Sequence, residues 1–270
     1  MSGNLGVRGT PAGRSGAVAW VDGEVVEVAE VDGREAALRS GRLTASLPRA
    51  GSSEGRQLRR WIVQVLAAER VVVREAAARG IDGGSAPALG ELVPDRAGML
   101  GVGSVAADLL ARSAVARAVF VGVTGDVEVG DDVVARYWRA NPEEFRVPER
   151  RVVRHAMGDA DPVARPARTV RRGELGGVLG DAVFGAGAGS VVGPVQDAVG
   201  THRVLVVEVL PARTLGLDEV REDVRARLLL GARRRAFTAW LDRRMAESVR
   251  LADGFEHPGD PGQPDNTHRH

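Results

Sequence analysis

Two long stretches with helical periodicity lie far apart in this 270-residue chain. In residues 53–79 and again in 218–249, apolar residues recur every three or four positions, with arginines and acidic residues between them. An amphipathic helix of this length needs another element against which to bury its apolar face. Each stretch offers the other such a surface. We therefore expect a helical domain that is discontinuous in sequence and is formed by residues 16–145 together with 214–251.

Between these helices the pattern changes to that of strands. Residues 151–157 and the apolar run 202–210 have the composition of strands, and Pro211 closes the second one. They predict a small strand-containing unit, residues 146–213, inserted into the helical domain. A short hairpin is expected near the N-terminus, where Asp22-Gly23 is a strong tight-turn signal. The predicted fold class is therefore α+β.

The two ends of the chain lack apolar periodicity. Residues 1–15 are rich in glycine, serine and arginine, and we expect a flexible leader without a secretory signal. Residues 252–270 are rich in proline, glycine, aspartate and histidine. This tail has too few apolar residues to fold by itself.

Composition excludes several kinds of chemistry. The chain has no cysteine and no lysine, so all 37 basic residues are arginine. This excludes thiol nucleophiles, disulfides, cysteine-ligated metals and lysine Schiff bases. The formal net charge is +1, and the arginines are interleaved with acidic residues; this balance argues against a nucleic-acid partner. No apolar run is long enough for a membrane span. We therefore expect a cytoplasmic protein with no membrane partner.

Several short strings occur in an order that is typical of one family. They are Ala17–Glu24, Val133–Pro148, Val152–His155, Gly173–Leu175, Asp181–Phe184, Gly189–Val195 and Gly200–Val204. Over most of residues 17–250 the chain resembles the SurA/PrsA-type parvulin foldases, which are helical chaperone modules carrying an inserted peptidyl-prolyl isomerase domain. The resemblance implies a SurA-N-like, discontinuous helical chaperone-like domain. It also implies that the inserted unit is a small parvulin-like antiparallel-sheet domain.

The resemblance assigns a candidate site to the inserted unit. Its histidines would be His155 on the first strand and His202 on the last, with Met157, Leu175 and Phe184 as the apolar, substrate-binding wall. Rotation about an X-Pro bond faces a barrier of ~18–20 kcal/mol from amide resonance. An apolar slot with polar groups that favour a twisted amide lowers it without a cofactor, a metal or a covalent step. The alternative is a structural pair of core histidines that holds the strands in register.

The interval between the first-strand histidine and the Gly-Leu string is short for this family. Only residues 156–172 fill it, and they contain Pro162 and Pro166. The family's central cysteine or aspartate is not identified by spacing, since Asp159 and Asp161 fit equally. The resemblance therefore implies a shortened domain whose isomerase activity is weak or lost.

Three functions are compatible with these patterns. The first is a parvulin-like isomerase and chaperone that binds unfolded or proline-containing polypeptide, including its own C-terminal tail. The second is a non-catalytic accessory protein that binds one dedicated protein partner. The third is a metal-binding protein acting through the histidines of the tail, His257, His268 and His270. The oligomeric state is open.

Overall fold

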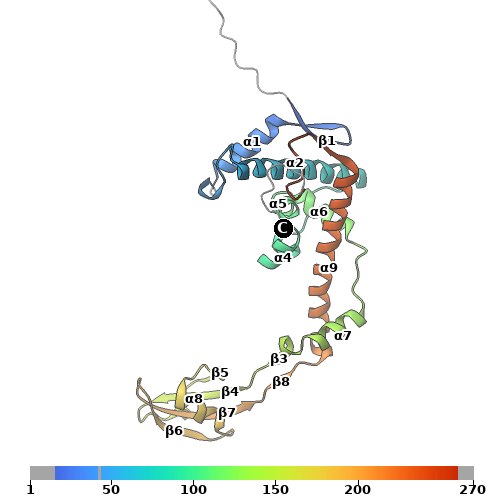
Figure 1. Ribbon diagram of the computed structural model, residues 1–270. Coiled ribbons are helices and arrows are strands. Elements are labelled where there is room, and N and C mark those ends of the chain that lie inside the picture. The colour runs from blue at the N-terminus through green and yellow to red at the C-terminus, as the bar shows by residue number, and fades with distance from the viewer. Residues whose placement is uncertain (1–15, 42–43, 261–270) are drawn as a thin grey trace, which may run out of the picture. The chain divides into compact units, whose positions relative to one another are not determined.

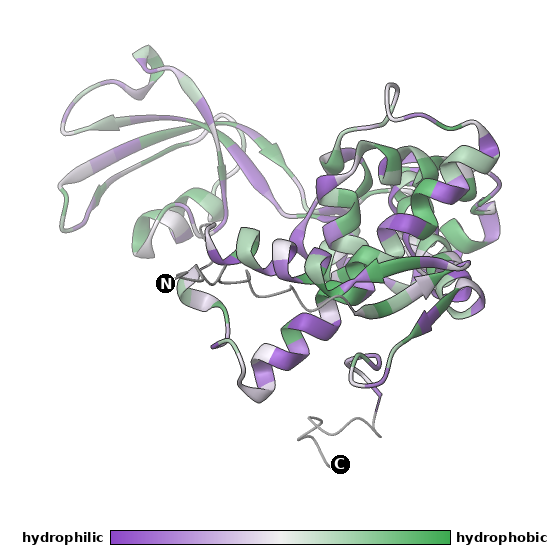
Figure 2. Ribbon diagram, turned by 90° about the horizontal axis from the view of Figure 1, so that it is seen from above, coloured by the Kyte–Doolittle hydropathy of each residue, from purple (hydrophilic) through white to green (hydrophobic). Residues whose placement is uncertain are grey.

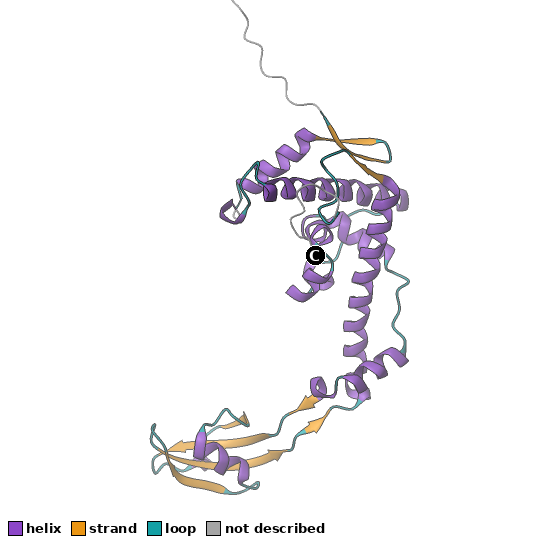
Figure 3. Ribbon diagram, viewed as in Figure 1, coloured by secondary structure: helices purple, strands orange, loops and turns teal. Residues whose placement is uncertain are grey.

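The computed structural model describes residues 16–41 and 44–260 and shows an α+β protein with small antiparallel sheets (Figures 1 and 3). It divides into two compact units. The helical unit comprises Met1–Glu128 and Leu229–His270, and the sheet unit comprises Val129–Leu228. The segment 146–213, predicted as the insertion, lies within the sheet unit. The predicted leader 1–15 and residues 261–270 of the tail lie outside the described residues.

The helical unit is built around α2 (Ser53–Arg79). Ser52 accepts a hydrogen bond from the amide of Gly55 at the start of the helix, and Gly80 ends it with φ +63°. Its apolar face is buried along most of its length and packs on the other helices of the unit. These are α1 (Val28–Arg39), α3 (Leu89–Leu92), α4 (Arg96–Gly101), α5 (Ser104–Arg112), α6 (Ala114–Val123) and the C-terminal part of α9 (Leu217–Ser248).

A three-stranded sheet completes this unit. The predicted hairpin is confirmed as β1 (Ala17–Val21) and β2 (Glu24–Glu27), joined at Asp22-Gly23, where both residues have positive φ. A third strand, β9 (Val249–Leu251), pairs with β1 directly after α9. The chain after the long helix therefore returns to the N-terminal hairpin.

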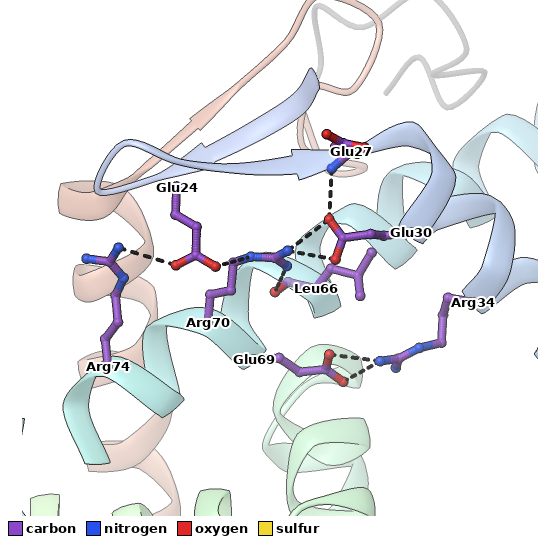
Figure 4. Close-up of polar contacts among 8 residues, drawn as sticks. All are labelled: Glu24, Glu27, Glu30, Arg34, Leu66, Glu69, Arg70 and Arg74. Atoms are coloured by element: carbon purple, nitrogen blue, oxygen red, sulfur yellow. Dashed lines mark hydrogen bonds and ion pairs between the residues drawn. The ribbon is translucent and has the colours of Figure 1, made fainter. Parts of the chain in front are cut away.

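Arginines of α2 tie the hairpin and α1 to this helix (Figure 4). Arg70 donates to the Glu30 carboxylate at 2.7 and 2.9 Å and to Glu24 at 3.2 Å. Glu69 accepts two hydrogen bonds of 2.8 Å from Arg34 on α1. Such forked arginine–carboxylate pairs add geometric specificity to the apolar packing below them.

The sheet unit contains one four-stranded antiparallel sheet, in the order β5-β4-β7-β6. Its strands contain both hydrophobic and hydrophilic segments (Figure 2), and burial alternates along much of the two central strands. They are β4 (Arg150–Met157), β5 (Ala167–Arg171), β6 (Val191–Gln196) and β7 (Thr201–Leu210). Helix α8 (Gly177–Gly185) supplies Leu179, Val183 and Phe184 to the core on one face of this sheet.

A second apolar cluster of this unit lies outside the sheet. Val134 of α7 (Asp131–Ala140) and Phe145 pack with Val220 and Val224 from the first part of α9. The short strands β3 (Arg146–Val147) and β8 (Arg213–Thr214) pair next to it. In the described residues, no helix combines the length and apolarity that a membrane span requires.

Candidate functional site

The two predicted histidines lie on the central strands of the four-stranded sheet. Strands β4 and β7 are antiparallel, with His155 opposite Val204 and Met157 opposite His202. Side chains two residues apart on a strand share a face. His155 and His202 therefore lie diagonally on the face that also carries the buried Val204.

The imidazoles of these residues are in direct contact. His155 Nε2 and His202 Nδ1 are 2.9 Å apart, and the rings stack with a centroid distance of 5.1 Å and an interplanar angle of 25°. His202 is buried, whereas His155 is partly exposed. The structure therefore unites the two residues that the sequence resemblance assigned to one site.

An acidic residue completes this cluster. Asp197 Oδ1 lies 2.8 Å from His202 Nε2 and accepts hydrogen bonds from the amides of Val199 and Gly200. Sequence reasoning missed Asp197. Its position five residues before His202, across the turn between β6 and β7, is the signal that identifies it.

The direction of the hydrogen bond between the rings depends on the tautomer of each imidazole. In the tautomer with Nε2–H of His202 toward the Asp197 carboxylate, Nδ1 of His202 accepts from Nε2–H of His155, and Nδ1 of His155 is left as an acceptor.

Burial and neighbouring charges shift the pKa values of this cluster. Burial lowers the pKa of His155, and the positive charges of His202 and Arg168 lower it further, while Asp197 acts in the opposite direction. The pKa of Asp197 is lowered first by its hydrogen bond with His202 and next by the amide of Val199. These shifts favour a neutral His155 beside an ionised Asp197.

The three apolar residues predicted with the histidines are divided between two places. Met157 is 43% exposed and lies beside the β6–β7 turn, close to Gly200. Leu175 and Phe184 instead line a separate cavity of about 340 Å³. No histidine is among the residues that line this cavity.

Phe184 is held beside two arginines. Its ring lies under the guanidinium groups of Arg151 and Arg172, at 5.2 and 4.8 Å, and its carbonyl accepts a 2.8 Å hydrogen bond from Arg151. Of the three apolar residues predicted with the histidines, Met157 is the one that lies opposite His202 in the strand register.

The metal hypothesis concerns a different part of the chain. Within residues 16–41 and 44–260, no group of three or more histidine, aspartate or glutamate side chains is placed to hold a metal ion. His257 Nδ1 accepts a hydrogen bond from the amide of Gly259 at 3.0 Å. His268 and His270 lie outside the described residues.

The geometry thus defines an α+β chain with a helical unit and an antiparallel-sheet unit that carries a histidine pair. Residues 17–54 match a family of unknown function, DUF7158. No curated protein matches the chain.

Among solved structures, the chain is similar to two from work on the virulence factor PEB4 and the periplasmic protein Cj1289 of Campylobacter jejuni, described as SurA-like chaperones. The first is 14% identical, with 86% of this chain and 96% of the other covered and a TM-score of 0.40. The second is 11% identical, with 87% and 99% covered and a TM-score of 0.41. PrsA from Bacillus subtilis is 13% identical, with 87% and 93% covered and a TM-score of 0.26.

Proposed function

We propose that this chain is a parvulin-like foldase that binds unfolded or proline-containing polypeptide, with weak or lost isomerase activity. The observation that supports the proposal most directly is the 2.9 Å contact between His155 and His202. The sequence resemblance selects these two residues from distant segments, and the strand register brings them together. The parvulin-like part would comprise residues 146–213, and the proposed compartment is the cytoplasm.

The cluster has chemistry suited to an amide in rotation. His155 is neutral and partly exposed, and its Nδ1 is free to accept a hydrogen bond. Polar groups that stabilise the twisted amide more than the planar one lower the barrier. Met157 supplies an exposed apolar contact next to the pair. Leu175 and Phe184 line a separate cavity, so fewer apolar residues surround the proposed proline-binding slot than the sequence resemblance implied. We therefore expect low isomerase activity.

Isomerisation would be tested in a protease-coupled assay on proline peptides. We expect a weak rate above background in the wild type and loss of that rate in His155→Ala and in His202→Ala. Arg203→Ala is the matched control, because Arg203 adjoins His202 on β7 but points to the opposite face of the sheet. Equal rates in all four proteins would assign the histidines a structural role only.

Polypeptide binding would be measured separately, as suppression of the aggregation of a chemically unfolded client protein. We expect suppression by the wild type and by both histidine variants, because the histidines act on rotation and not on capture. Failure of the wild type to suppress aggregation would contradict the foldase proposal.

A second function is favoured by the close contacts of His202. Both of its ring nitrogens have partners within 2.9 Å, which is the arrangement of a structural histidine. A wild type without isomerase and aggregation-suppressing activity would therefore favour a non-catalytic accessory protein that binds one dedicated partner.

A further inference from the structure

An apolar cavity of the helical unit lies beside the end of the described chain. It has a volume of about 660 Å³ and lies between α2, α5 and the C-terminal part of α9. Its apolar lining residues are Val102, Val105, Ala106, Leu241, Met245, Ala246, Val249 and Leu251. His257, three residues before the last described residue, Asp260, lines the same cavity. The residues that follow position 260 therefore start close to this apolar surface.

The segment 252–260 is held against the helical unit by a buried cation. Arg60 on α2 is 3% exposed, and its Nε donates to the Gly254 carbonyl at 3.1 Å and lies 3.7 Å from the Glu256 carboxylate. Phe255 packs against the apolar core between these two contacts. Hydrogen bonds to charged groups are stronger than those between neutral groups. The contacts of Arg60 therefore fix the place from which the last ten residues start.

The wall of the cavity carries one unpaired charge. Thr238, Asp242 and Met245 of α9 line the cavity, as expected for residues three or four positions apart on one helix face. Asp242 is exposed, and its carboxylate has no ion pair or hydrogen bond among the described residues. No described arginine lines the cavity. The wall thus combines an apolar surface with a negative charge that is available to a cation.

The remaining sequence, 261–270, contains groups that match this wall. Pro261 and Pro264 are apolar, and Arg269 is its one arginine. Proline loses little backbone freedom when it becomes ordered, because its φ angle is already restricted. The nine residues from position 260 to Arg269 span up to about 30 Å when extended, whereas a helix face of seven residues is only about 10 Å long. The segment is therefore long enough to bring Arg269 to Asp242.

We propose that residues 261–270 dock on this cavity of their own chain, with the two prolines against the apolar wall and Arg269 paired with Asp242. The covalent connection makes a weak contact sufficient, because a short flexible tether gives an effective concentration on the order of millimolar. The docked segment would cover the cavity. This inference goes beyond the function proposed above and does not depend on the histidine pair.

The absence of cysteine from the chain allows a direct test by disulfide formation. Thr267→Cys is combined with Ala246→Cys, because Ala246 is exposed, lines the cavity and lies one helical turn after Asp242. The matched control combines Thr267→Cys with Val73→Cys, since Val73 is exposed on α2 and does not line this cavity. With oxidised glutathione, we expect the first pair to form its disulfide roughly 10-fold faster. Equal rates in the two pairs would overturn the proposal.

The same reaction at two protein concentrations shows which chain supplies the segment. An intramolecular disulfide leaves the protein monomeric on a denaturing gel, and we expect its rate to be independent of concentration. A disulfide-linked dimer whose rate rises with concentration would assign the docked segment to a second copy and would overturn the proposal.

Charge reversal tests the ion pair in the Ala246→Cys, Thr267→Cys protein. Arg269→Glu and Asp242→Arg should each slow disulfide formation roughly 2- to 5-fold, the effect expected of an exposed ion pair. The two changes together should restore most of the rate, because the opposite charges then face each other again. The effects should weaken at high salt. A double variant as slow as the single ones would contradict the pairing of Asp242 with Arg269.

Removal of residues 261–270 tests whether the segment covers the cavity. The shortened chain keeps the contacts of Arg60 with Gly254 and Glu256. The apolar dye ANS reports exposed apolar surface, and we expect the shortened chain to bind more of it than the full chain. Ala246→Phe should fill the cavity of the shortened chain and remove this difference. Equal dye binding with and without the segment would show that it does not cover the cavity.

Discussion

The two units bury different kinds of side chain. The core of the helical unit contains an aromatic cluster in which Phe237 contacts Phe120 and Trp240, with ring centroids 5.2 and 5.6 Å away. The core beside the four-stranded sheet is smaller and consists mainly of valines, with Phe184 as its aromatic residue. On the covered face of this sheet, ionisable groups are buried as well, including Arg151 and His202.

The buried side chains of the helical unit therefore serve mainly stability, whereas those of the sheet unit include groups that can take part in chemistry. Large apolar side chains stabilise the helical unit, which also buries the charged residues Glu35 and Arg60. Because the pKa of Glu35 is lowered from its ordinary value of 4.5, the stability of this unit is expected to fall only at more acidic pH than that of the sheet unit. The sheet unit buries groups that titrate or need partners, so its stability depends on hydrogen bonds and on protonation. Buried titratable groups on a covered sheet face are more typical of a functional site than of a purely structural part of a protein.

The largest effect is expected from the aromatic cluster. Phe237 is completely buried, and Phe237→Ala should lower the free energy of unfolding by about 3–5 kcal/mol through lost burial and a residual cavity. Hydrogen exchange measured by mass spectrometry should show faster exchange in peptides of the helical unit and little change in 150–210. Val73→Ala is the control on α2, because Val73 is 58% exposed. Equal loss of protection in both units would contradict their separation.

A smaller effect is expected at the buried arginine of the sheet. Arg151 donates to the Phe184 carbonyl and forms an ion pair of 2.5 Å with Glu149. Arg151→Ala should cost about 2 kcal/mol, because a charge-assisted hydrogen bond is lost and the carbonyl of a buried residue is left without it. This loss of unfolding free energy is measured by urea unfolding followed through the fluorescence of Trp138, which lies in the same unit. Arg171→Ala changes an exposed arginine of β5 and should stay within about 0.5 kcal/mol.

The strongly periodic elements could be predicted from the sequence. The predicted helix 53–79 coincides with α2, and the strand patterns 151–157 and 202–210 lie within β4 and β7. Each of these elements has one clearly apolar face, so the spacing of its apolar residues indicates whether it is a helix or a strand. The helical unit is also formed by two separate segments, but its boundaries fall at Glu128 and Leu229 and not at residues 145 and 214.

Elements with weak periodicity could not be predicted. The edge strand β5 buries only Val170, and β6 contains Gly193-Pro194, so neither shows a strand pattern. The apolar residues of segment 104–121 are compatible with one continuous helix. In the structure the helix ends at Arg112, and Ser113 caps the next one. A serine that can cap competes locally with helix continuation, and tertiary packing decides the outcome.

The candidate site could be predicted only in part. Alternation along β4 and β7 indicates which face the histidines share, and a resemblance indicates that they belong together. The distance of Phe184 from them depends on where α8 lies along the sheet, which periodicity does not encode. Asp197 was missed because its contact with His202 depends on the turn between β6 and β7.

The smallest expected effect concerns the protonation of His155. Because folding lowers the pKa of His155, the unfolded chain binds more protons than the folded one just below the ordinary histidine value of about 6.5. The free energy of unfolding should therefore decrease as the pH falls from about 6.5 toward 5. In His155→Gln, whose side chain is not protonated in this pH range, this decrease should be smaller than in the wild type. His257→Gln changes a histidine of the helical unit and should leave the dependence of the unfolding free energy on pH as it is in the wild type. Both are measured by urea unfolding followed through the fluorescence of Trp138. The same slope in His155→Gln would show that protonation of His155 is not linked to folding, and the contrast in pH dependence between the two units would then need another source.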